Sequence, residues 1–192
     1  ETLWSARIEG NNTTLAEYIE KIIEETVDQD ESQQEVKNLE DAISWIEENT
    51  KKATKITRAY ISELHKIVTK WLTPPLKWRK WEWSHYPWEL RPINVQIQKS
   101  AHIPPDYTVL PDYFEEFLIF LNTNVAEQYQ LLMVAIAHHR FAYIHPFDNG
   151  NWRMWRLLNY ALLIRLWFQV KNGRIINPSS VFYSDRDVYY KN

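Results

Sequence analysis

The segment from His145 to Arg156, with the sequence HPFDNGNWRMWR, constrains this chain more than any other part of it. Its spacing predicts a short turn followed by a helix, and the first N–H groups of a helix lack internal partners and carry partial positive charge. Arg153 and Arg156 lie three residues apart, so they share one helical face. Such a junction favours polyphosphate, and His145 is the nearby side chain able to accept a proton near neutral pH. These residues predict a site for nucleotide chemistry.

The same segment resembles the signature of the Fic family, His-Pro-Phe-x-Asp/Glu-Gly-Asn-Gly-Arg-x-x-Arg, whose members mostly transfer AMP from ATP to a protein hydroxyl. Asn149 stands where the family usually has an acidic metal ligand, and Trp152 stands where it usually has glycine. Six diagnostic positions match: His145, Phe147, Gly150, Asn151, Arg153 and Arg156. The resemblance implies a protein adenylyltransferase that uses ATP and Mg²⁺.

The resemblance also implies a role for each residue of the segment. His145 is the expected general base for the attacking hydroxyl. We expect a backbone turn to face the α- and β-phosphates, one arginine to neutralise them and the last arginine to hold the γ-phosphate. The expected ATP-binding positions are Gly150, Asn151, Trp152, Arg153 and Arg156. The expected metal ligand is Asn149 or Asp148, and the amide of Asn149 is a weaker ligand for Mg²⁺ than a carboxylate.

Tryptophan is abundant in this chain and glycine is rare. There are 10 tryptophans and 3 glycines, whereas an average protein of this length carries roughly 13 glycines. Trp71 is one of several tryptophans in a region where turn residues would be normal. We hypothesise that several tryptophans replace glycines of a parent sequence. We also predict that Trp152 impairs ATP binding, and that a positive φ there would strain the backbone.

A second motif lies near the beginning of the chain, where residues 5–10 read SARIEG. It resembles the Ser/Thr-x-x-x-Glu-Gly/Asn inhibitory motif found N-terminal to the catalytic core in one class of Fic proteins. The resemblance implies that Glu9 pairs with Arg156 and occupies the γ-phosphate position. Ser5 lies one helical turn from Glu9 and is expected to brace that contact.

Two further groups of residues are candidates for binding substrates. Alternation over Pro92–Gln98 predicts a short strand, half of a β-hairpin flap that could pair with an extended segment of a target protein. A strand that merely covers the core is the alternative. The flap residues are Ile93, Asn94, Val95, Gln96 and Ile97. The candidates for an adenine and ribose wall, for which core packing is the alternative, are Asn159, Tyr183, Tyr189 and Tyr190.

Helical periodicity dominates the rest of the sequence. An apolar run, residues 131–137, predicts a buried central helix, and Thr14 with Glu17 predicts a capping box. The expected helices cover residues 3–9, 14–27, 34–49, 56–72, 110–122, 125–143 and 151–170 and continue from 178. We predict an all-α Fic-type bundle with a short β-hairpin flap near the active site. It forms one domain, 1–192, with an inhibitory helix at 1–10, a loop and flap region at 74–111 and the active-site motif at 145–156.

Composition limits the partners. The net charge of −3 does not favour nucleic acid or anionic membranes, although a basic cluster with interleaved tryptophans at Lys77, Arg79 and Lys80 could suggest single-stranded nucleic acid. The adjacent His138 and His139 diverge on a helix, so a structural role is favoured over metal binding. The chain has no cysteine, which suits the cytoplasm. We expect ATP and a protein with an accessible hydroxyl as partners, and no nucleic acid or membrane. A homodimer is a further possibility.

Other activities fit the same motif. The site could remove AMP from a modified protein, because Glu9 could position a water molecule, or it could use another nucleotide. A catalytically silent interaction module is the alternative from a different class, and Trp152 and Asn149 are the residues that favour it.

Overall fold

The computed structural model describes residues 5–7, 11, 13–14, 16–17, 19, 31–52, 54–72, 89–97, 100–166 and 183–184. The main helices of this part are α3 (Glu31–Asn49), α4 (Arg58–Thr69), α5 (Leu110–Leu121), α6 (Gln130–Ile144) and α7 (Asn151–Arg165). A short 3₁₀ helix, η2 (Glu127–Tyr129), leads into α6. The all-α prediction is confirmed for the described residues.

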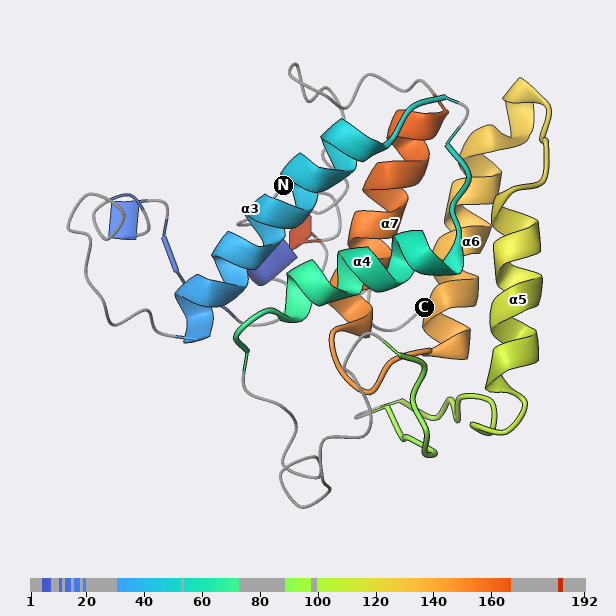
Figure 1. The fold of residues 1–192 in the computed structure, drawn as a ribbon, viewed down its shortest axis with the longest axis horizontal. Coiled ribbons are helices and arrows are strands. Elements are labelled where there is room, and N and C mark those ends of the chain that lie inside the picture. Colours follow the sequence, from blue (N-terminus) through green and yellow to red (C-terminus); the bar gives the residue numbers. More distant parts are fainter. Residues whose placement is uncertain are drawn as a thin grey trace.

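Helix α7 is the centre of the bundle. It packs between α3 on one side and α6 on the other, while α4 crosses α3 and α5 lies outside α6 (Figure 1). Nearly every residue of α7 is buried, including two arginines of the motif. Large apolar side chains from all five helices fill the core around it, among them Leu39, Leu64, Phe114, Phe117, Phe141 and Leu158.

Local sequence signals explain where several helices begin. The Thr57 hydroxyl accepts a hydrogen bond from the backbone N–H of Tyr60 and so caps α4. Proline in the first turn of α5 fits a position whose N–H has no helical partner. Near the beginning of the chain, the carboxylate of Glu17 accepts from the N–H of Thr14, and the Thr14 hydroxyl accepts from the N–H of Glu17. The predicted capping box is therefore confirmed.

The prediction that residues 131–137 form the buried central helix is wrong. Leu131, Leu132 and Ile136 of α6 are exposed, while Met133 and Val134 face the core. The buried central helix is α7, whose polar side chains have partners inside the protein and so do not need solvent. No helix in the described part of the chain is both long and apolar enough to cross a membrane.

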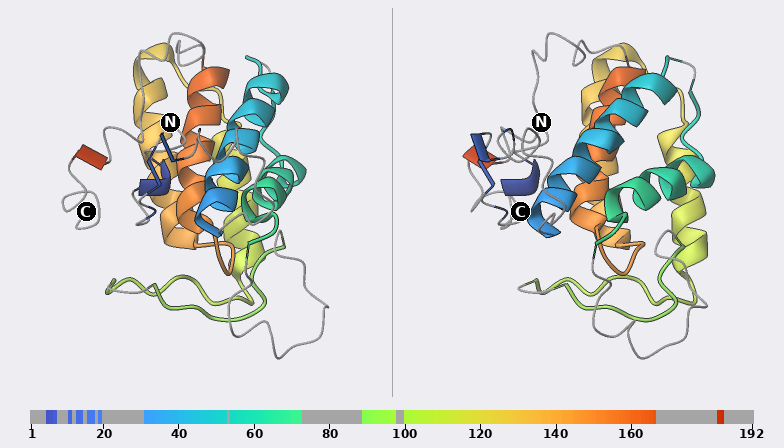
Figure 2. Two further views of the ribbon diagram at one scale, coloured as in Figure 1. Left: turned by 90° about the vertical axis from the view of Figure 1, so that its left-hand side faces the viewer. Right: turned by 60° about the vertical axis from the view of Figure 1, so that its left-hand side comes forward.

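The predicted β-hairpin is also absent from the described residues. Two arms, 89–97 and 100–109, extend together away from the helices without a strand (Figure 2). Prolines at 104 and 105 cannot donate ladder hydrogen bonds. Instead, the side chain of Asn94 joins the arms, because it donates to Asp106 and accepts from the N–H of Tyr107. We keep the name flap for these two arms.

Candidate active site

The predicted motif forms the junction between α6 and α7. Helix α6 ends at Ile144 and is followed by His145, whose φ of 47° is left-handed, and α7 begins after Gly150, whose φ is 74°. The side chain of Asn151 accepts from the N–H of Phe147 at 2.9 Å and donates to its carbonyl at 2.7 Å. Asn151 therefore closes the turn that places His145 beside the N-terminus of α7.

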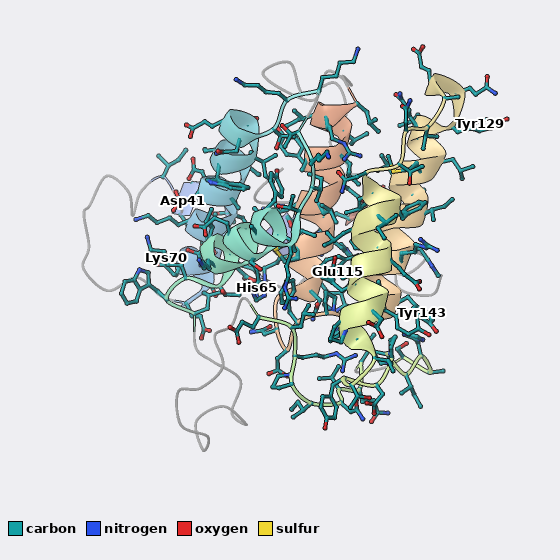
Figure 3. All side chains as sticks on the ribbon, turned by 45° about the vertical axis from the view of Figure 1, so that its right-hand side comes forward. Asp41, His65, Lys70, Glu115, Tyr129 and Tyr143 are labelled. Atoms are coloured by element: carbon teal, nitrogen blue, oxygen red, sulfur yellow. The ribbon has the colours of Figure 1, made fainter. Side chains whose placement is uncertain are left out.

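A second histidine, which the sequence analysis missed, supports this turn. His65 lies on the face of α4 toward α7 and is 1% exposed (Figure 3). Its Nε2 is 2.8 Å from the carbonyl oxygen of Asn149, and its ring stacks on Phe147 with centroids 3.8 Å apart. A carbonyl can only accept, so Nε2 carries the proton. Histidine at an apolar helical position was the available signal, since His65 shares a face with Ile61, Leu64 and Val68.

Gly150 is required at the turn for two reasons. Its left-handed φ favours glycine, and an added Cβ would lie 3.3 Å from Nε2 of His65 and 3.4 Å from Thr69. The turn therefore packs directly on α4. Among the described residues, no side-chain hydrogen bond caps α7 at Gly150, so the first N–H groups of the helix form a positively polarised end.

Both arginines of the motif are buried beside this end of α7. Arg153 is 5% exposed and pairs with Glu35 of α3, with a nitrogen–oxygen distance of 3.2 Å. Arg156 is 1% exposed and donates from Nε to the Ser5 hydroxyl at 2.8 Å and from Nη2 to the Ser5 carbonyl at 3.1 Å. Asn11 donates to the second carboxylate oxygen of Glu35. The beginning of the chain thus contacts Arg156 directly and Arg153 through Glu35.

Three histidines near this junction have lowered pKa values. Burial lowers the pKa of His145 to about 4, and the positive charge of Arg91 lowers it further, while the carbonyl of Ala142 and the charge of Asp148 oppose the shift. Burial likewise lowers the pKa of His65 to about 4, with Arg153 contributing. His138 behaves in the same way beside Arg156. These shifts favour the neutral imidazole near pH 7, which is the form in which His145 would accept a proton.

Several predicted residues lie elsewhere or outside the described part. Glu9, Tyr189 and Tyr190 lie outside the described residues. Asn159 is buried and bonded to Nδ1 of His138, and Tyr183 is 37% exposed. The assignment of these four residues to an adenine and ribose wall stays a prediction. His138 also lies 4.5 Å from the ring of Trp155, centroid to centroid, and its structural role stays a prediction.

Trp152 does not have the strained backbone considered from the sequence. It lies in the first turn of α7 and is absent from the residues with positive φ, which are His145, Gly150 and Trp71 in the described part. Its ring meets Trp155 edge-on, with centroids 4.1 Å apart. A strain penalty at Trp152 is therefore excluded, and its effect on ATP binding stays a prediction.

The donors for a metal ion are few. Asp148 is half-buried, and the side-chain oxygen of the exposed Asn149 already accepts from the N–H of Gly150. No group of three or more acidic, histidine or cysteine side chains able to hold an ion occurs in the described residues. Mg²⁺ is commonly held by one or two carboxylates together with substrate phosphates. One carboxylate therefore fits Mg²⁺ that arrives with a nucleotide.

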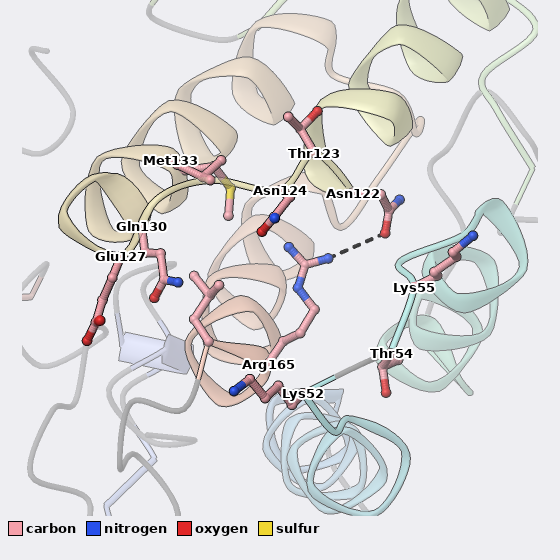
Figure 4. A pocket seen from close by; sticks show the side chains of 12 residues that line it. Lys52, Thr54, Lys55, Asn122, Thr123, Asn124, Glu127, Gln130, Met133 and Arg165 are labelled. Atoms are coloured by element: carbon pink, nitrogen blue, oxygen red, sulfur yellow. Dashed lines mark hydrogen bonds between the residues drawn. The ribbon is translucent and has the colours of Figure 1, made fainter.

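A separate hollow lies at the other end of α7. It has a volume of about 480 Å³ and is lined by residues that include Lys52, Lys55, Asn122, Gln130 and Arg165 (Figure 4). Helix α7 rises roughly 1.5 Å per residue, so its two ends are about 20 Å apart. The hollow is therefore distinct from the motif.

Comparison with known proteins agrees with this geometry. The sequence profile of the Fic/DOC family matches residues 55–163, and the chain belongs to this family. It is 30% identical over 169 residues to the protein adenylyltransferase Fic of Drosophila willistoni, covering 84% of this chain and 31% of that relative. It is 28% identical over 161 residues to the protein of the same name from Nematostella vectensis, covering 82% of this chain and 33% of the relative. The chain spans about a third of the length of these relatives.

Solved structures of the family share the fold. A Fic family protein from Desulfovibrio desulfuricans G20 superimposes with a TM-score of 0.73 at 23% identity, covering 98% of this chain and 53% of that chain. A Fic domain containing signaling protein from Bacteroides thetaiotaomicron VPI-5482 gives a TM-score of 0.72 at 18% identity, covering 97% and 66%. The Fic-type bundle predicted from the sequence is confirmed.

Proposed function

We propose that this chain is a protein adenylyltransferase that transfers AMP from ATP to a tyrosine, serine or threonine hydroxyl of a target protein or of itself. The observation that carries the proposal is a neutral histidine, His145, at the turn before a helix whose first turns hold two buried arginines. The names of the curated relatives support the same activity.

The reaction needs a base and a field of positive charge. The target hydroxyl attacks the α-phosphorus, His145 takes its proton, and the bond to pyrophosphate breaks so that pyrophosphate leaves. The start of α7 faces the phosphates with its N–H groups, while Arg153 and Arg156 offset the charge that accumulates on pyrophosphate. Asp148 or Asn149 would hold Mg²⁺, which would neutralise phosphate charge when bound.

The proposal includes autoinhibition by the beginning of the chain. Both hydrogen bonds from Arg156 to Ser5 occupy donors that a γ-phosphate would use. Glu9 follows Ser5 by one helical turn, so a helical segment would direct its carboxylate to the same side. A carboxylate beside Arg156 would repel the γ-phosphate and withdraw the cation. Release of this segment would then be required before ATP binds productively.

Radioactive labelling tests the activity. We expect label from ATP carrying ³²P at the α-phosphate, with a divalent metal, to enter protein in the Glu9→Gly variant more than in the unmodified chain. ATP labelled at the γ-phosphate should give none, because pyrophosphate leaves. His145→Ala in the Glu9→Gly background should lose the label, since a positioned base contributes on the order of 10²–10⁴ in rate. His139→Ala is the matched control, because His139 is exposed on the same helix.

The same assay separates the alternatives. If label enters from another nucleoside triphosphate and not from ATP, that other nucleotide is the donor. Loss of AMP from a pre-labelled target, dependent on Glu9, would indicate the reverse reaction. Restoring glycine with Trp152→Gly should raise labelling if the indole occupies phosphate space, and equal labelling would remove that argument. An absence of label in all of these variants would favour a silent interaction module.

A further inference from the structure

Arg91 is a buried arginine that joins the catalytic turn to the flap, and neither the motif nor the sequence analysis assigned it a role. It is 2% exposed. Its Nε donates to the carbonyl of His145 at 2.9 Å, its Nη1 to Ile93 at 2.9 Å, and its Nη2 to Pro105 at 2.5 Å. Its own N–H donates to the carbonyl of Pro146 at 2.9 Å. One residue therefore contacts the turn and both arms of the flap.

The guanidinium suits these three carbonyls because its N–H groups point outward in a rigid planar fork. A lysine ammonium is a point charge on a flexible chain and cannot fix three directions at once. The described flap has no strand ladder to hold its arms in place. Besides Asn94, which joins the two arms, Arg91 ties both arms to the catalytic turn. It also fixes the carbonyl of His145, a residue whose left-handed φ of 47° must be held by its surroundings.

We propose that Arg91 is a positioning residue that sets the flap at a fixed distance from the His145 imidazole, so that a target hydroxyl presented by the flap reaches the base. This inference rests on the proposed adenylyl transfer. Arg91 acts through the backbone carbonyls that it binds and does not itself touch the reacting atoms.

The charges around His145 support the inference. Burial is the largest cause of the lowered pKa of His145; Arg91 and, more weakly, His102 also lower it, whereas Asp148 raises it. His102 comes from the second arm of the flap, where its Nε2 is 2.9 Å from the carbonyl of Tyr143. Asp106 and Asp148 are the acidic groups that face Arg91. Removing the cation of Arg91 while leaving both acids should therefore raise the pKa of His145.

The test compares Arg91→Met and Arg91→Lys with Arg165→Met, all in the Glu9→Gly chain. Arg165 is a matched control because it is also buried and donates to a backbone carbonyl, that of Leu121, but at the far end of α7. Three measurements are made on each: the His145 titration by NMR, hydrogen exchange of the residue-91 and Tyr107 amides, and kcat and KM for AMP transfer to a target peptide. The two amides report the turn and the flap, respectively.

We expect Arg91→Met to raise the pKa of His145 and to speed hydrogen exchange at both amides about tenfold. It should also lower kcat/KM for the peptide about a hundredfold, which is the loss expected when reacting groups are misplaced by about 1 Å. The KM for ATP should change less than about threefold, because the peptide and not the nucleotide has lost its position. Arg91→Lys should keep the pKa of His145 near its original value, but its amide exchange should be as fast as in Arg91→Met. Arg165→Met should change none of these.

Unchanged exchange and an unchanged His145 titration in Arg91→Met would overturn the inference, as would equal effects in Arg165→Met. If Arg91→Met does not fold, hydrogen exchange in Arg91→Lys tests the inference instead. Exchange as slow in Arg91→Lys as in the Glu9→Gly chain would overturn the inference. Absence of AMP transfer in the Glu9→Gly chain would contradict the proposed function. The titration and exchange would still decide whether Arg91 holds the flap on the turn.

Discussion

The two ends of α7 both hold buried arginines, but only one end has the features of an anion site. At the C-terminal end, Arg165 donates to the carbonyl of Leu121 at 2.6 Å and reaches the side-chain oxygen of Asn122 at 3.4 Å. At the N-terminal end, Arg153 and Arg156 lie near His65 and His138, whose pKa values are lowered to about 4 mainly by burial and to a lesser extent by these arginines. The first arrangement ties helices together, and the second gathers positive charge.

The helix itself explains the difference. Its last carbonyls carry partial negative charge, so a cation such as Arg165 stabilises that end without any ligand. Its first N–H groups carry partial positive charge, so adding arginines there raises electrostatic energy until an anion arrives. In this structure Glu35 and Ser5 meet the two arginines. On the proposed function, Glu35 and Ser5 occupy donors that phosphate oxygens would use, whereas Arg165 binds the last residue of α5.

The largest expected effect comes from removing an arginine at each end. Arg156→Met in the Glu9→Gly chain should reduce AMP transfer roughly 10- to 150-fold, because a hydrogen bond to a charged group contributes about 1.5–3 kcal/mol. Arg165→Met should lower the free energy of unfolding and leave the transfer rate of the folded protein unchanged. Initial rates and urea denaturation distinguish the two. Equal loss of rate in both variants would abolish the contrast between the ends.

Acid should destabilise the turn through its buried histidine. The pKa of His65 is about 4 in the folded state and 6.5 in the unfolded state, so its contribution to stability is complete above pH 6.5 and is lost as the pH falls toward 4. At pH 5 this loss is about 2 kcal/mol for His65. Urea midpoints at pH 7 and pH 5 should therefore differ less in His65→Gln than in the original chain. His139→Gln, at an exposed histidine, should leave the difference intact, and an equal difference in all three proteins would contradict the burial effect.

The sequence predicted features whose signals are local. The helical periodicity of α3, α4, α5 and α7 located these helices within a few residues at most ends. The contrast between α6 and α7 was not predictable in the same way, because Leu131 and Leu132 look like core residues and the arginines of α7 look like surface residues. What decides their burial is the presence of partners elsewhere in the chain.

Arg91 and His65 show why the supporting residues of the site escaped prediction. Both bind backbone carbonyl groups, and a carbonyl is the same chemical group at every position of a chain. No side chain in the sequence therefore marks their partners. The motif itself was visible because its histidine, glycine and arginines must be particular residue types at fixed spacing. Its support depends on contacts between distant segments, which only the fold supplies.

A smaller effect is expected from adding one carbon at the turn. Gly150→Ala should lower the free energy of unfolding by about 1–3 kcal/mol, because the left-handed φ of 74° strains alanine and the new Cβ lies 3.3 Å from His65. Thermal unfolding measures this loss. His65→Ala removes the close neighbour, so the double variant should lose less than the sum of the single changes. Strict additivity would mean that backbone strain, and not the contact with α4, makes glycine necessary.

The smallest predicted effect has the opposite sign and concerns the end of α4, the helix that supports the turn. Trp71 follows this end with a left-handed φ of 60° and is 81% exposed. A left-handed conformation costs a residue with a side chain about 1–2 kcal/mol, and glycine is the residue usually found there. Trp71→Gly should therefore raise the free energy of unfolding by up to about 1 kcal/mol, after the greater chain entropy of glycine is subtracted.

Lys70→Gly is the matched control for that change, because Lys70 has an ordinary φ of −58° and gains nothing from glycine. It should lower stability by roughly 0.5–1 kcal/mol, so the two neighbouring substitutions are expected to move the thermal midpoint in opposite directions. The same pair tests the hypothesis that tryptophans occupy glycine positions in this chain. A gain in stability from Trp71→Gly without one from Lys70→Gly would support the hypothesis at position 71, because the two neighbouring positions differ in the sign of φ. A loss at both positions would show that the indole of Trp71 stabilises the end of α4 despite its exposure.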